Sequence, residues 1–374
     1  MQLQALRLIV KRGITMDNLH VNLGENSYNI IFGDSFENLA DELKKINAPE
    51  KLLIVTDTNV EKLYANEVKT YLNNNGFDSN VYAFPAGEEN KTMDTILGIC
   101  GVCIENGLDR KSMIVALGGG VVGDMAGFAA SIYMRGINFV QIPTTLLSQS
   151  DSSVGGKTGI DFMDSKNILG AFHQPRLVYI NVNTLKTLPE IQFISGMGEV
   201  IKHGIIRDSE FYGFIKNNPD KIKALDSDTL IEMSKRNCSI KAQVVECDEK
   251  ESGLRAILNF GHTIGHAIES AMNFTMTHGE CVGLGMAAVS YIAKNRRLID
   301  SDILENIIDT MLSYGFKVKL NLPDCDTIYR FMQKDKKKSN GKLNFVLPVK
   351  IGEVVRVNDV TQDEIFDAIK YISI

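Results

Sequence analysis

The sequence predicts an α/β protein in which a parallel, doubly wound sheet is followed by a mostly α-helical half. Short β-branched runs alternate with helical stretches as far as residue 182, which is typical of strand–helix–strand units. After Leu188-Pro189 the pattern changes to long helical segments. The length of 374 residues exceeds what one hydrophobic core usually serves. We therefore expect two domains, at 16–189 and 190–374.

The N-terminal half alternates expected strands with expected helices. The strand segments are rich in β-branched and aromatic residues and are bounded by turn residues. The expected strands are Tyr28–Phe32, Leu52–Thr56, Asn80–Phe84, Met113–Leu117, Phe139–Ile142 and Val178–Val182. The expected helices are Glu37–Ile46, Val60–Asn74, Thr92–Gly107 and Val122–Arg135. In a sheet of this kind a ligand binds at the carboxyl ends of the strands.

The C-terminal half is expected to be almost wholly helical. The expected helices are 209–217, 226–247, 254–272, 279–296 and 300–314, and a short β pair (Lys342–Leu347, Glu353–Val357) precedes a last helix from Thr361. Residues 1–15 are basic and apolar but lack the longer apolar core and cleavage site of a signal peptide. Because Met16 follows directly, we expect 1–15 to be a disordered or wrongly assigned extension.

Composition excludes several classes of partner. A net charge of −6 and a pI near 5.6 argue against nucleic acid or an anionic membrane. No apolar stretch approaches the roughly 20 residues of a membrane span. The six cysteines are scattered without a disulfide framework, which fits the reducing cytoplasm. Cys100 and Cys103 form a CxxC within an expected helix, and core thiols are favoured over a redox or zinc site.

A glycine-rich turn follows the strand Met113–Leu117. Gly118, Gly120 and Gly123 match G-x-G-x-x-G between an expected strand and an expected helix, as a dinucleotide site requires. Glycines allow the backbone to approach a pyrophosphate, and the helix N-terminus supplies N–H donors. A tight strand–helix turn without a ligand is the alternative interpretation.

The acid that usually binds the ribose is absent from its expected position, about 20 residues after the glycines. Gln141-Ile142-Pro143-Thr144-Thr145 stands there instead. Asp57, which ends the strand Leu52–Thr56 and is followed by Asn59, is a candidate replacement. Glu88 and Lys91 add polar groups at another strand end, where a solvated helix start is an equally good interpretation. The arrangement is therefore not that of an ordinary dehydrogenase.

Three residues in glycine-flanked segments predict a divalent-metal site. Glu199 lies in Gly-Met-Gly-Glu-Val-Ile-Lys-His, His262 lies in Asn-Phe-Gly-His-Thr-Ile-Gly-His, and His278 opens His-Gly-Glu. One carboxylate and two imidazoles describe a catalytic site with an open position for substrate. His266, four residues after His262, shares a helix face with it and is either a further ligand or an acid–base group. Core or surface histidines are the alternative, which the neighbouring glycines and Glu199 disfavour.

Basic residues gather in the same segments. They are Lys157, Lys202, Lys241, Arg255 and Lys336–Lys338. Each lies beside glycines or on an otherwise apolar segment, where an unpaired charge is costly unless it meets an anion. Solvated surface lysines are the alternative, but the cluster is what an anionic substrate would need.

These segments together resemble the 3-dehydroquinate synthase family, from about residue 25 to the end of the chain. The most specific stretches are 143–158 (Pro-Thr-Thr-Leu-Leu-Ser-Gln-Ser-Asp-Ser-Ser-Val-Gly-Gly-Lys-Thr), 259–269 (Asn-Phe-Gly-His-Thr-Ile-Gly-His-Ala-Ile-Glu) and 335–337 (Asp-Lys-Lys). The resemblance implies an N-terminal Rossmann-like domain, a helical C-terminal domain and an active site in the cleft between them. It also implies NAD and one divalent ion, zinc or cobalt, as cofactors.

The resemblance assigns roles by matching motif. Glu199, His262 and His278 are the implied metal ligands. The implied NAD contacts are Asp57, Asn59, Glu88, Lys91, Gly119, Gly120, Asp124, Thr144, Thr145, Asp151, Ser152, Lys157 and Lys166. The implied substrate and catalytic residues are Lys157, Asn167, Lys202, Lys241, Glu251, Arg255, Asn259, His266 and Lys337 or its neighbour Lys336. Arg135 resembles the family residue that is lent across a homodimer interface.

The implied activity is a carbon–oxygen lyase reaction of the shikimate pathway. The sugar phosphate 3-deoxy-D-arabino-heptulosonate 7-phosphate is oxidised transiently by NAD, loses phosphate, is reduced, opens and closes by an intramolecular aldol step. A 2-deoxy-scyllo-inosose synthase, a metal-dependent polyol dehydrogenase of the glycerol dehydrogenase type and a non-catalytic NAD-sensing protein are the rivals. Four residues depart from the family's usual motif. Ile191 and Gln192 stand where the family usually has Arg-Glu, so Gln192 replaces an acid expected near the cofactor, and Gly198 and His203 flank Glu199 and Lys202.

Overall fold

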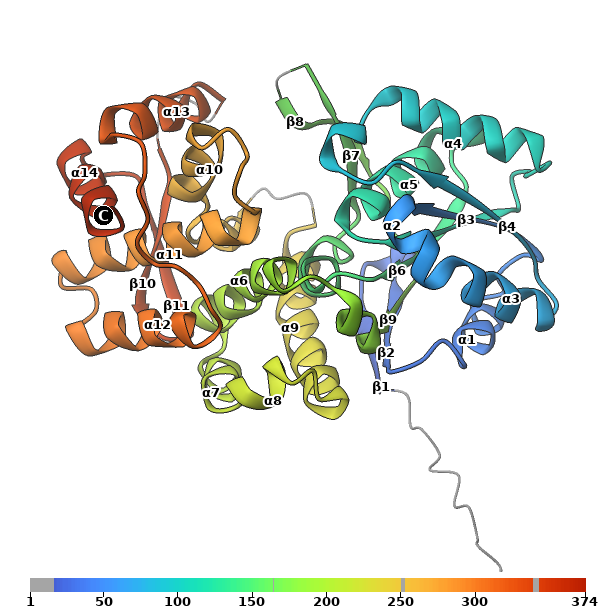
Figure 1. Ribbon diagram of the computed structural model, residues 1–374, viewed down its shortest axis with the longest axis horizontal. Helices are drawn as coiled ribbons and strands as arrows, with labels where there is room; N and C mark the ends of the chain where they lie inside the picture. The colour runs from blue at the N-terminus through green and yellow to red at the C-terminus, as the bar shows by residue number, and fades with distance from the viewer. Residues whose placement is uncertain (1–16, 164, 250–252, 339–342) are drawn as a thin grey trace, which may run out of the picture.

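The computed structural model describes residues 17–163, 165–249, 253–338 and 343–374, with the side chains of 334–338 excepted. The expectation for residues 1–15 lies outside this part of the chain. Figure 1 shows a sheet-containing half and a helical half side by side, with α6 (Glu190–Arg207) and α9 (Ser227–Cys247) between them. The expected α/β class is confirmed. The division near residue 189 stays a proposal.

Seven strands form one sheet in the order β1-β2-β9-β6-β5-β3-β4. The strands are β1 (Asp17–Val21), β2 (Tyr28–Gly33), β3 (Lys51–Asp57), β4 (Asp78–Phe84), β5 (Met113–Gly118), β6 (Asn138–Pro143) and β9 (Leu177–Asn181). All neighbouring pairs are parallel except β1 and β2. The six expected strands are therefore confirmed, whereas β1 was not expected. Only one residue of β1 is fully buried, and an edge strand of five residues gives only a weak hydrophobic pattern in the sequence.

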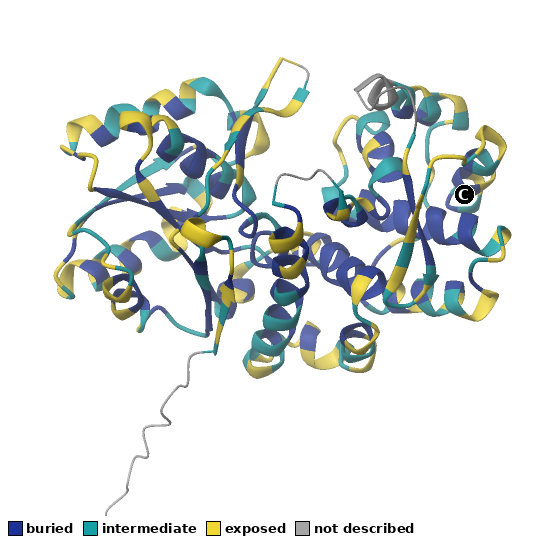
Figure 2. Ribbon diagram, turned by 180° about the vertical axis from the view of Figure 1, so that it is seen from behind, coloured by how far each residue is buried: buried dark blue, intermediate teal, exposed yellow. Residues whose placement is uncertain are grey.

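Helices cover both faces of this sheet because successive side chains of each buried strand point to opposite faces. Leu52 and Ile54 of β3 pack against α1 (Leu39–Lys45) and α3 (Asn66–Asn74). On the other face, Leu53 and Val55 pack with α4 (Met93–Glu105) and α5 (Gly120–Ile132). The buried sheet is visible as the dark layer between the helices in Figure 2. Cys103 of α4 is buried and Cys100 half-buried, as expected of core thiols.

A β-hairpin that was not expected projects beside the sheet (Figure 1). It consists of β7 (Lys157–Phe162) and β8 (Ser165–Phe172), which pair antiparallel. Phe162, Ile168 and Phe172 are exposed, and the buried part of β7 is only the short stretch 158–160, so the alternating pattern by which a strand is recognised in sequence is weak. The hairpin packs on α5 through Gly127 and Thr158.

The second half is helical apart from one β pair. Its elements are α6, α7 (Ser209–Asn217), α8 (Pro219–Lys223), α9, α10 (His262–Ala271), α11 (His278–Asn295), α12 (Ser301–Ser313), α13 (Cys325–Lys338), β10 (Phe345–Lys350), β11 (Glu353–Val357) and α14 (Gln362–Tyr371). One continuous core joins these helices to the β1–β2–β9 end of the sheet through residues such as Ile30, Val178 and Ile205. No helix in the described part of the chain has the length and apolar character needed to cross a membrane.

The expected helix at 254–272 was wrong as a single element. The chain forms a 3-10 helix at Leu254–Asn259, and α10 begins only at His262. Gly261, between them, has a φ of +80°, a left-handed conformation that interrupts a right-handed helix and that glycine adopts at little cost. The expected helix Val122–Arg135 also ends early, at Ile132, because Met134 and Arg135 have φ values of 50° and 70°.

Glycines allow α6, α10 and α11 to approach with their backbones in contact. A Cβ on Gly279 of α11 would overlap the backbone oxygen of Ser195 in α6, and one on Gly285 would overlap that of Gly261. A Cβ on Gly265 of α10 would lie 2.8 Å from the backbone oxygen of Cys281. Backbone atoms cannot rotate away as a side chain does. The spacing of these three helices therefore depends on the absence of side chains at these positions.

We predict that Gly285→Ala lowers the free energy of unfolding by about 1–3 kcal/mol, as overpacking of a core does. Urea denaturation measures it. Gly213→Ala in α7 is the control, because a Cβ there meets nothing within 4 Å. This variant should be unchanged or gain about 0.5–1 kcal/mol from helix propensity. Equal stability of Gly285→Ala and the parent would contradict the close approach.

Candidate active site

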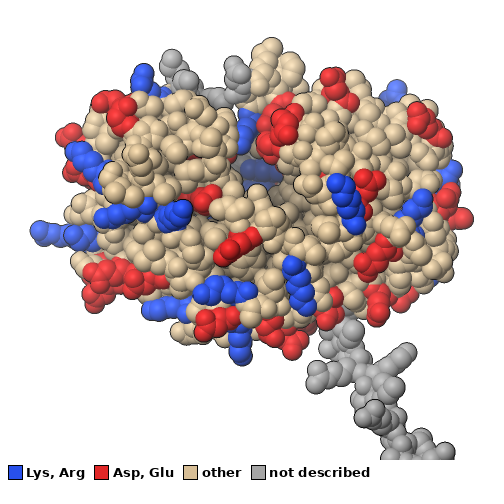
Figure 3. All heavy atoms as spheres, viewed as in Figure 1, with Lys and Arg blue, Asp and Glu red and all other residues tan. Residues whose placement is uncertain are grey.

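Candidate site residues from both halves face one cleft. One wall is formed by the carboxyl ends of β3, β4, β5 and β6 with the turns that follow them. The other is formed by α6 and by the first turns of α10 and α11. Figure 3 shows a hollow between the halves with lysine or arginine side chains at its floor. Two lysines of this region, Lys202 and Lys241, are almost fully buried.

The glycine-rich turn lies at the centre of the sheet wall. Gly118 ends β5, and Gly119 and Gly120 form the start of α5. A Cβ on Gly119 would lie 3.0 Å from Thr145, and one on Gly120 would lie 3.2 Å from Ser152, so the turn and the 144–152 segment are closely packed. The N–H groups of α5 open toward the strand ends at this point, which is the arrangement that binds a pyrophosphate.

The strand order brings the candidate ribose acid next to the glycines. β3 pairs with β5 in parallel, with Val55 opposite Ala116, so Asp57 and Gly118 end neighbouring strands. One oxygen of the Asp57 carboxylate accepts hydrogen bonds from the backbone N–H groups of Asn59 and Val60, at 2.8 and 2.9 Å. These two hydrogen bonds cap the short helix that follows β3 and fix the carboxylate at the sheet edge.

Lys91 links three segments of the sheet wall. Its buried ammonium donates to Asp124 of α5 at 2.7 Å and to Asn167 of β8 at 2.5 Å, and lies 3.9 Å from Glu88. Burial lowers the pKa of Lys91, but the carboxylates of Asp124 and Glu88 raise it more, so the lysine stays charged. The structure therefore brings together four of the residues expected from the sequence.

The sheet wall also contains buried polar atoms without a partner. The hydroxyls of Thr56 and Thr144, at the carboxyl ends of β3 and β6, form no hydrogen bond within the described residues. Buried hydroxyls in proteins are almost always satisfied. Together with the glycine turn, the unpaired hydroxyls fit a polar ligand such as a dinucleotide along this edge.

The metal candidates converge from three helices. Glu199 Oε1 of α6 lies 3.5 Å from His262 Nε2 of α10 and 3.6 Å from His278 Nε2 of α11. Glu199 is 1% exposed, and neither of its oxygens accepts a hydrogen bond of normal geometry within the described residues, although the Lys202 ammonium lies against one. A carboxylate and two imidazole nitrogens that face one point, with unsatisfied lone pairs, fit a divalent ion such as zinc or cobalt.

Neighbouring groups fix which nitrogen each imidazole presents. His262 Nδ1 lies 3.1 Å from the backbone oxygen of Phe260, and His278 Nδ1 lies 3.4 Å from a carboxylate oxygen of Glu269. Both oxygens can only accept, so Nδ1 carries the proton in each ring. Nε2 is therefore the nitrogen that each ring presents toward Glu199 and the one that could bind a metal ion.

The charges of these groups depend on one another. Burial raises the pKa of Glu199, but Lys202 and the two imidazoles lower it to well below its ordinary value. Burial and the nearby Lys202 ammonium lower the pKa of His262, so this imidazole is neutral and ready to bind a cation. Burial lowers the pKa of His278, but the adjacent carboxylates of Glu199 and Glu269 raise it more, to about 9, so without a metal ion this imidazole is protonated at neutral pH and binding of the ion would release its Nε2 proton.

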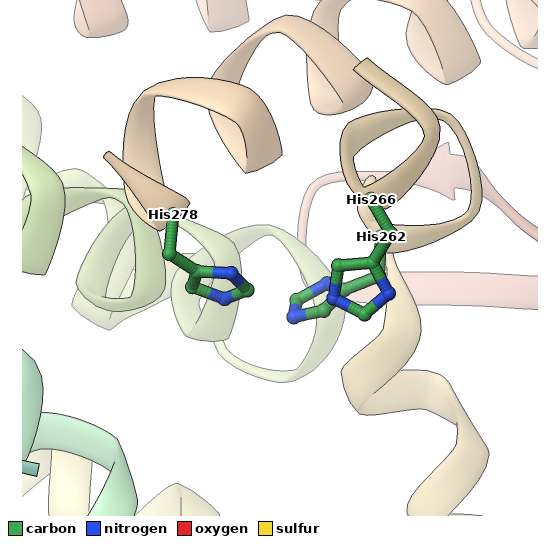
Figure 4. A group of neighbouring side chains, drawn as sticks. All are labelled: His262, His266 and His278. Carbon is green, nitrogen blue, oxygen red and sulfur yellow. The ribbon is translucent and has the colours of Figure 1, made fainter. Parts of the chain in front are cut away.

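His266 lies in the same group. Its ring centroid is 5.1 Å from that of His262 and 5.6 Å from that of His278, and the three rings converge in Figure 4. Ligand atoms of the three histidines lie within 4.8 Å of one another. His266 is more exposed than the other two and is placed where it can reach a substrate. The geometry is compatible both with a third imidazole ligand and with an acid–base group.

The remaining basic residues line the junction of the two halves. Lys241 of α9 forms an ion pair with Asp151 at 2.8 Å. Burial raises the pKa of Asp151, but Lys241 lowers it more, so the carboxylate stays ionised. Arg255 is 2% exposed, donates from Nη1 to the backbone oxygen of Glu249 at 2.7 Å, and lies next to Gly155.

Other expected site residues differ in their placement. Lys157 begins β7 and is exposed, and Asn259 is exposed at the end of the 3-10 helix. Arg135 is exposed in a strained turn after α5. Glu251 lies outside the described residues. Lys336 and Lys337 fall in α13, where the described structure does not include the side chains.

Two buried groups near the metal candidates were not expected from sequence. Glu269 contacts His278, and it could have been found because it follows His262 by seven residues, two turns along one helix face. His203 was seen only as a departure from a motif. It is fully buried, and its Nδ1 lies 2.8 Å from Asn237, whose amide donates to the backbone oxygen of Ser150 at 2.6 Å. No sequence signal connects α9 with these positions.

Comparisons with known proteins find similarity over nearly the whole chain. Family models described as 3-dehydroquinate synthase N-terminal and 3-dehydroquinate synthase C-terminal match residues 81–195 and 196–338. The chain is 51% identical to a 3-dehydroquinate synthase of Acetivibrio thermocellus over 91% of this chain and 95% of that protein. It is 50% identical to that of Ruminiclostridium cellulolyticum over 89% and 93% of the two chains.

Solved structures with a similar fold include related cyclases. A 2-epi-5-epi-valiolone synthase from Streptomyces hygroscopicus, solved with NAD+ and Zn2+, superposes with a TM-score of 0.85 at 28% identity over 92% of this chain and 96% of that one. A 2-deoxy-scyllo-inosose synthase with carbaglucose-6-phosphate, NAD+ and Co2+ gives 0.86 at 25% identity over 95% and 100%. A probable glycerol dehydrogenase from Sinorhizobium meliloti, at 16% identity and a TM-score of 0.59, shares the fold alone.

We predict that His278→Ala loses bound zinc or cobalt and that His266→Ala keeps it. Removal of one of three ligands leaves too few donors to hold the ion, whereas an acid–base residue contributes none. Elemental analysis of the purified variants measures the metal content, and turnover should fall in both. Full occupancy in His278→Ala would remove it from the ligand set, and metal loss in His266→Ala would favour three imidazole ligands.

Proposed function

The chain belongs to the 3-dehydroquinate synthase family, and from that premise we propose how its own residues divide the work of the reaction. The activity is that of a carbon–oxygen lyase that converts 3-deoxy-D-arabino-heptulosonate 7-phosphate to 3-dehydroquinate and phosphate. The single observation that supports the division is the meeting of Glu199, His262 and His278 opposite the glycine-rich turn of the sheet wall.

Two groups supply chemistry that amino acids lack. When bound, NAD supplies a reversible hydride acceptor, and the divalent ion supplies a Lewis acid for the substrate hydroxyls. We propose that Glu199, His262 and His278 hold the ion, and that the turn at Gly119 and Gly120 holds the dinucleotide phosphates. Asp57 accepts a hydrogen bond from the backbone N–H of Asn59, and Lys91 donates one to Asp124. These contacts hold Asp57 and Lys91 at the sheet edge where we propose that the cofactor binds.

The chain's own residues then orient the substrate and move its protons. His266, exposed beside two metal candidates, is suited to hold or take up a proton near the reacting carbons. The cationic groups of Lys202, Lys241 and Arg255 are buried, so they attract the carboxylate and phosphate of the substrate in a region of low dielectric constant. Orientation and charge stabilisation in a cleft are sufficient roles for these side chains.

The substrate carboxylate separates this proposal from a related cyclase. A substrate of 2-deoxy-scyllo-inosose synthase carries no carboxylate, so Arg255 and Lys241 would lack that anion. A buried guanidinium that lacks an anion is costly. A dehydrogenase of the glycerol type would instead release NADH in every turnover. The shared fold alone does not distinguish these reactions.

We also propose a homodimer that uses the face near Arg135. Arg135 is exposed beside Ile132 and Met134, which are 43% and 42% exposed. Exposed apolar side chains of this kind are frequent at subunit contacts. Arg135 would then reach the site of the partner subunit. The six free cysteines support the cytoplasm as the compartment.

We predict NAD-dependent phosphate release without accumulation of NADH. Because the hydride returns to the same substrate molecule, one NAD serves many turnovers. Purified protein with the heptulosonate phosphate, NAD and Co2+ is assayed for inorganic phosphate and, in parallel, for the absorption band of reduced nicotinamide. Formation of NADH in an amount stoichiometric with the substrate consumed would contradict the cyclase assignment and favour a dehydrogenase.

We predict that Arg255→Ala lowers kcat/KM for the heptulosonate phosphate by about 10²-fold or more, from the ~2–5 kcal/mol typical of breaking a buried charge pair. Arg255→Lys should rescue activity only in part, because an ammonium cannot bind a carboxylate in a bidentate manner. Metal content and thermal unfolding of the purified variants are the controls, and both should be nearly unchanged. Near-normal kcat/KM in Arg255→Ala would mean that Arg255 does not hold the substrate.

A further inference from the structure

Glu269 of α10 is a buried carboxylate that lies behind a metal candidate. It is 7% exposed, and its Oε2 lies 3.4 Å from Nδ1 of His278. The other ring nitrogen of His278, Nε2, lies 3.6 Å from Glu199. The two nitrogens of an imidazole point in different directions, so a ring that presents Nε2 to an ion cannot present Nδ1 to the same ion. Glu269 therefore faces the back of the ring.

Lys166 reaches Glu269 from the opposite wall of the cleft. It belongs to β8, in the sheet-containing half, and its Nζ lies 2.8 Å from Glu269 Oε1. The same ammonium lies 4.4 Å from the ring centroid of Phe274, in the loop between α10 and α11. One carboxylate oxygen thus faces His278 and the other faces Lys166. Both ends of the carboxylate are held, which limits its rotation.

We propose that Glu269 is a positioning residue that fixes the orientation and tautomer of His278, and that Lys166 holds Glu269 in place from the β7–β8 hairpin. This inference rests on the proposed function in taking His278 as a metal ligand. A carboxylate that accepts from Nδ1–H leaves Nε2 as the ligand nitrogen and increases its electron donation. The resemblance had assigned Lys166 to NAD, and no role had been assigned to Glu269.

The two histidines differ in how they are oriented. The Nδ1–H of His262 donates to the neutral backbone oxygen of Phe260, two residues away in the same chain segment. His278 instead depends on a charged side chain that is itself tied to the other half of the protein. Metal affinity should therefore respond to the hairpin through His278 and not through His262. Replacement of Lys166 should therefore lower the metal affinity only in a protein that still contains Glu269.

The test measures Co2+ affinity in the absence of substrate and NAD. The parent protein and the variants Glu269→Gln, Lys166→Met and their combination are titrated with Co2+ against a chelator of known affinity. The visible absorption of bound Co2+ reports the ligand geometry. We expect Glu269→Gln to weaken Co2+ binding by about 10–100-fold, as is typical when the partner of a ligand histidine is removed, and to change the spectrum.

Lys166→Met, which keeps an apolar stem against Phe274, should weaken Co2+ binding by less than Glu269→Gln does. The double variant should bind Co2+ no more weakly than Glu269→Gln, because Lys166 acts through Glu269. Additive losses, or an unchanged affinity in Lys166→Met, would overturn the part of the proposal that concerns Lys166. An unchanged affinity and spectrum in Glu269→Gln would overturn the whole of it.

Glu42→Gln is the matched control for removing a buried acid. Glu42 of α1 is also 7% exposed and also pairs with a lysine, Lys45, at 2.6 Å, but it lies on the far side of the sheet from the site. Its Co2+ affinity should equal that of the parent, and a loss as large as in Glu269→Gln would mean a general structural effect. His278→Ala separates the two levels of inference. If His278→Ala keeps the metal, His278 is not a ligand and the proposed ligand set is wrong. If His278→Ala loses the metal while Glu269→Gln keeps it, only the positioning role of Glu269 is wrong.

Discussion

The close backbone approach of α6, α10 and α11 is the constraint on which the rest of the site depends. Side chains from three different helices meet at one point only if those helices are nearer than ordinary side chains allow. Gly279 against Ser195 and Gly285 against Gly261 provide this spacing. The same left-handed Gly261 that stops the preceding 3-10 helix allows α10 to begin at His262. One conformational feature therefore both terminates an element and positions a ligand candidate.

Buried charge is the second consequence of this assembly. Glu199 and Lys202 lie one turn apart on α6 and are both almost fully buried, and close by the buried Lys241 pairs with the half-buried Asp151. Such pairs rarely stabilise a fold relative to apolar packing. We interpret these charges as electrostatically preorganised for binding. Each charge offsets its neighbour until a cation and an anionic substrate bind. A chain with net charge −6 can thus present a basic cleft.

Much of the fold could be predicted from the sequence because buried parallel strands give strong local patterns. Leu52, Leu53, Ile54 and Val55 are all fully buried, and a short continuous apolar run of β-branched residues and leucines is typical of a strand covered on both faces. The β7–β8 hairpin gave no comparable signal, since only a short stretch of β7 is buried and no residue of β8 is. The ligand candidates were found from glycine-flanked motifs and a family resemblance. Glu269 was missed because its role arises from the contact of α10 with α11 and β8, which no local pattern encodes.

The way in which the two halves are joined suggests where the cleft can adjust. At its base, residues of β2 and β9 share one core with α6 and α9, and separating them would expose apolar surface at a cost of about 25 cal/mol per Å². At its mouth, β8 meets α10 through the ion pair of Lys166 with Glu269, and Lys166 is partly exposed. Because one partner of this pair is exposed, the pair contributes less to the joining of the two halves than the buried core at the base does. The base therefore fixes the ligand geometry, and the mouth can transmit the position of the hairpin to His278.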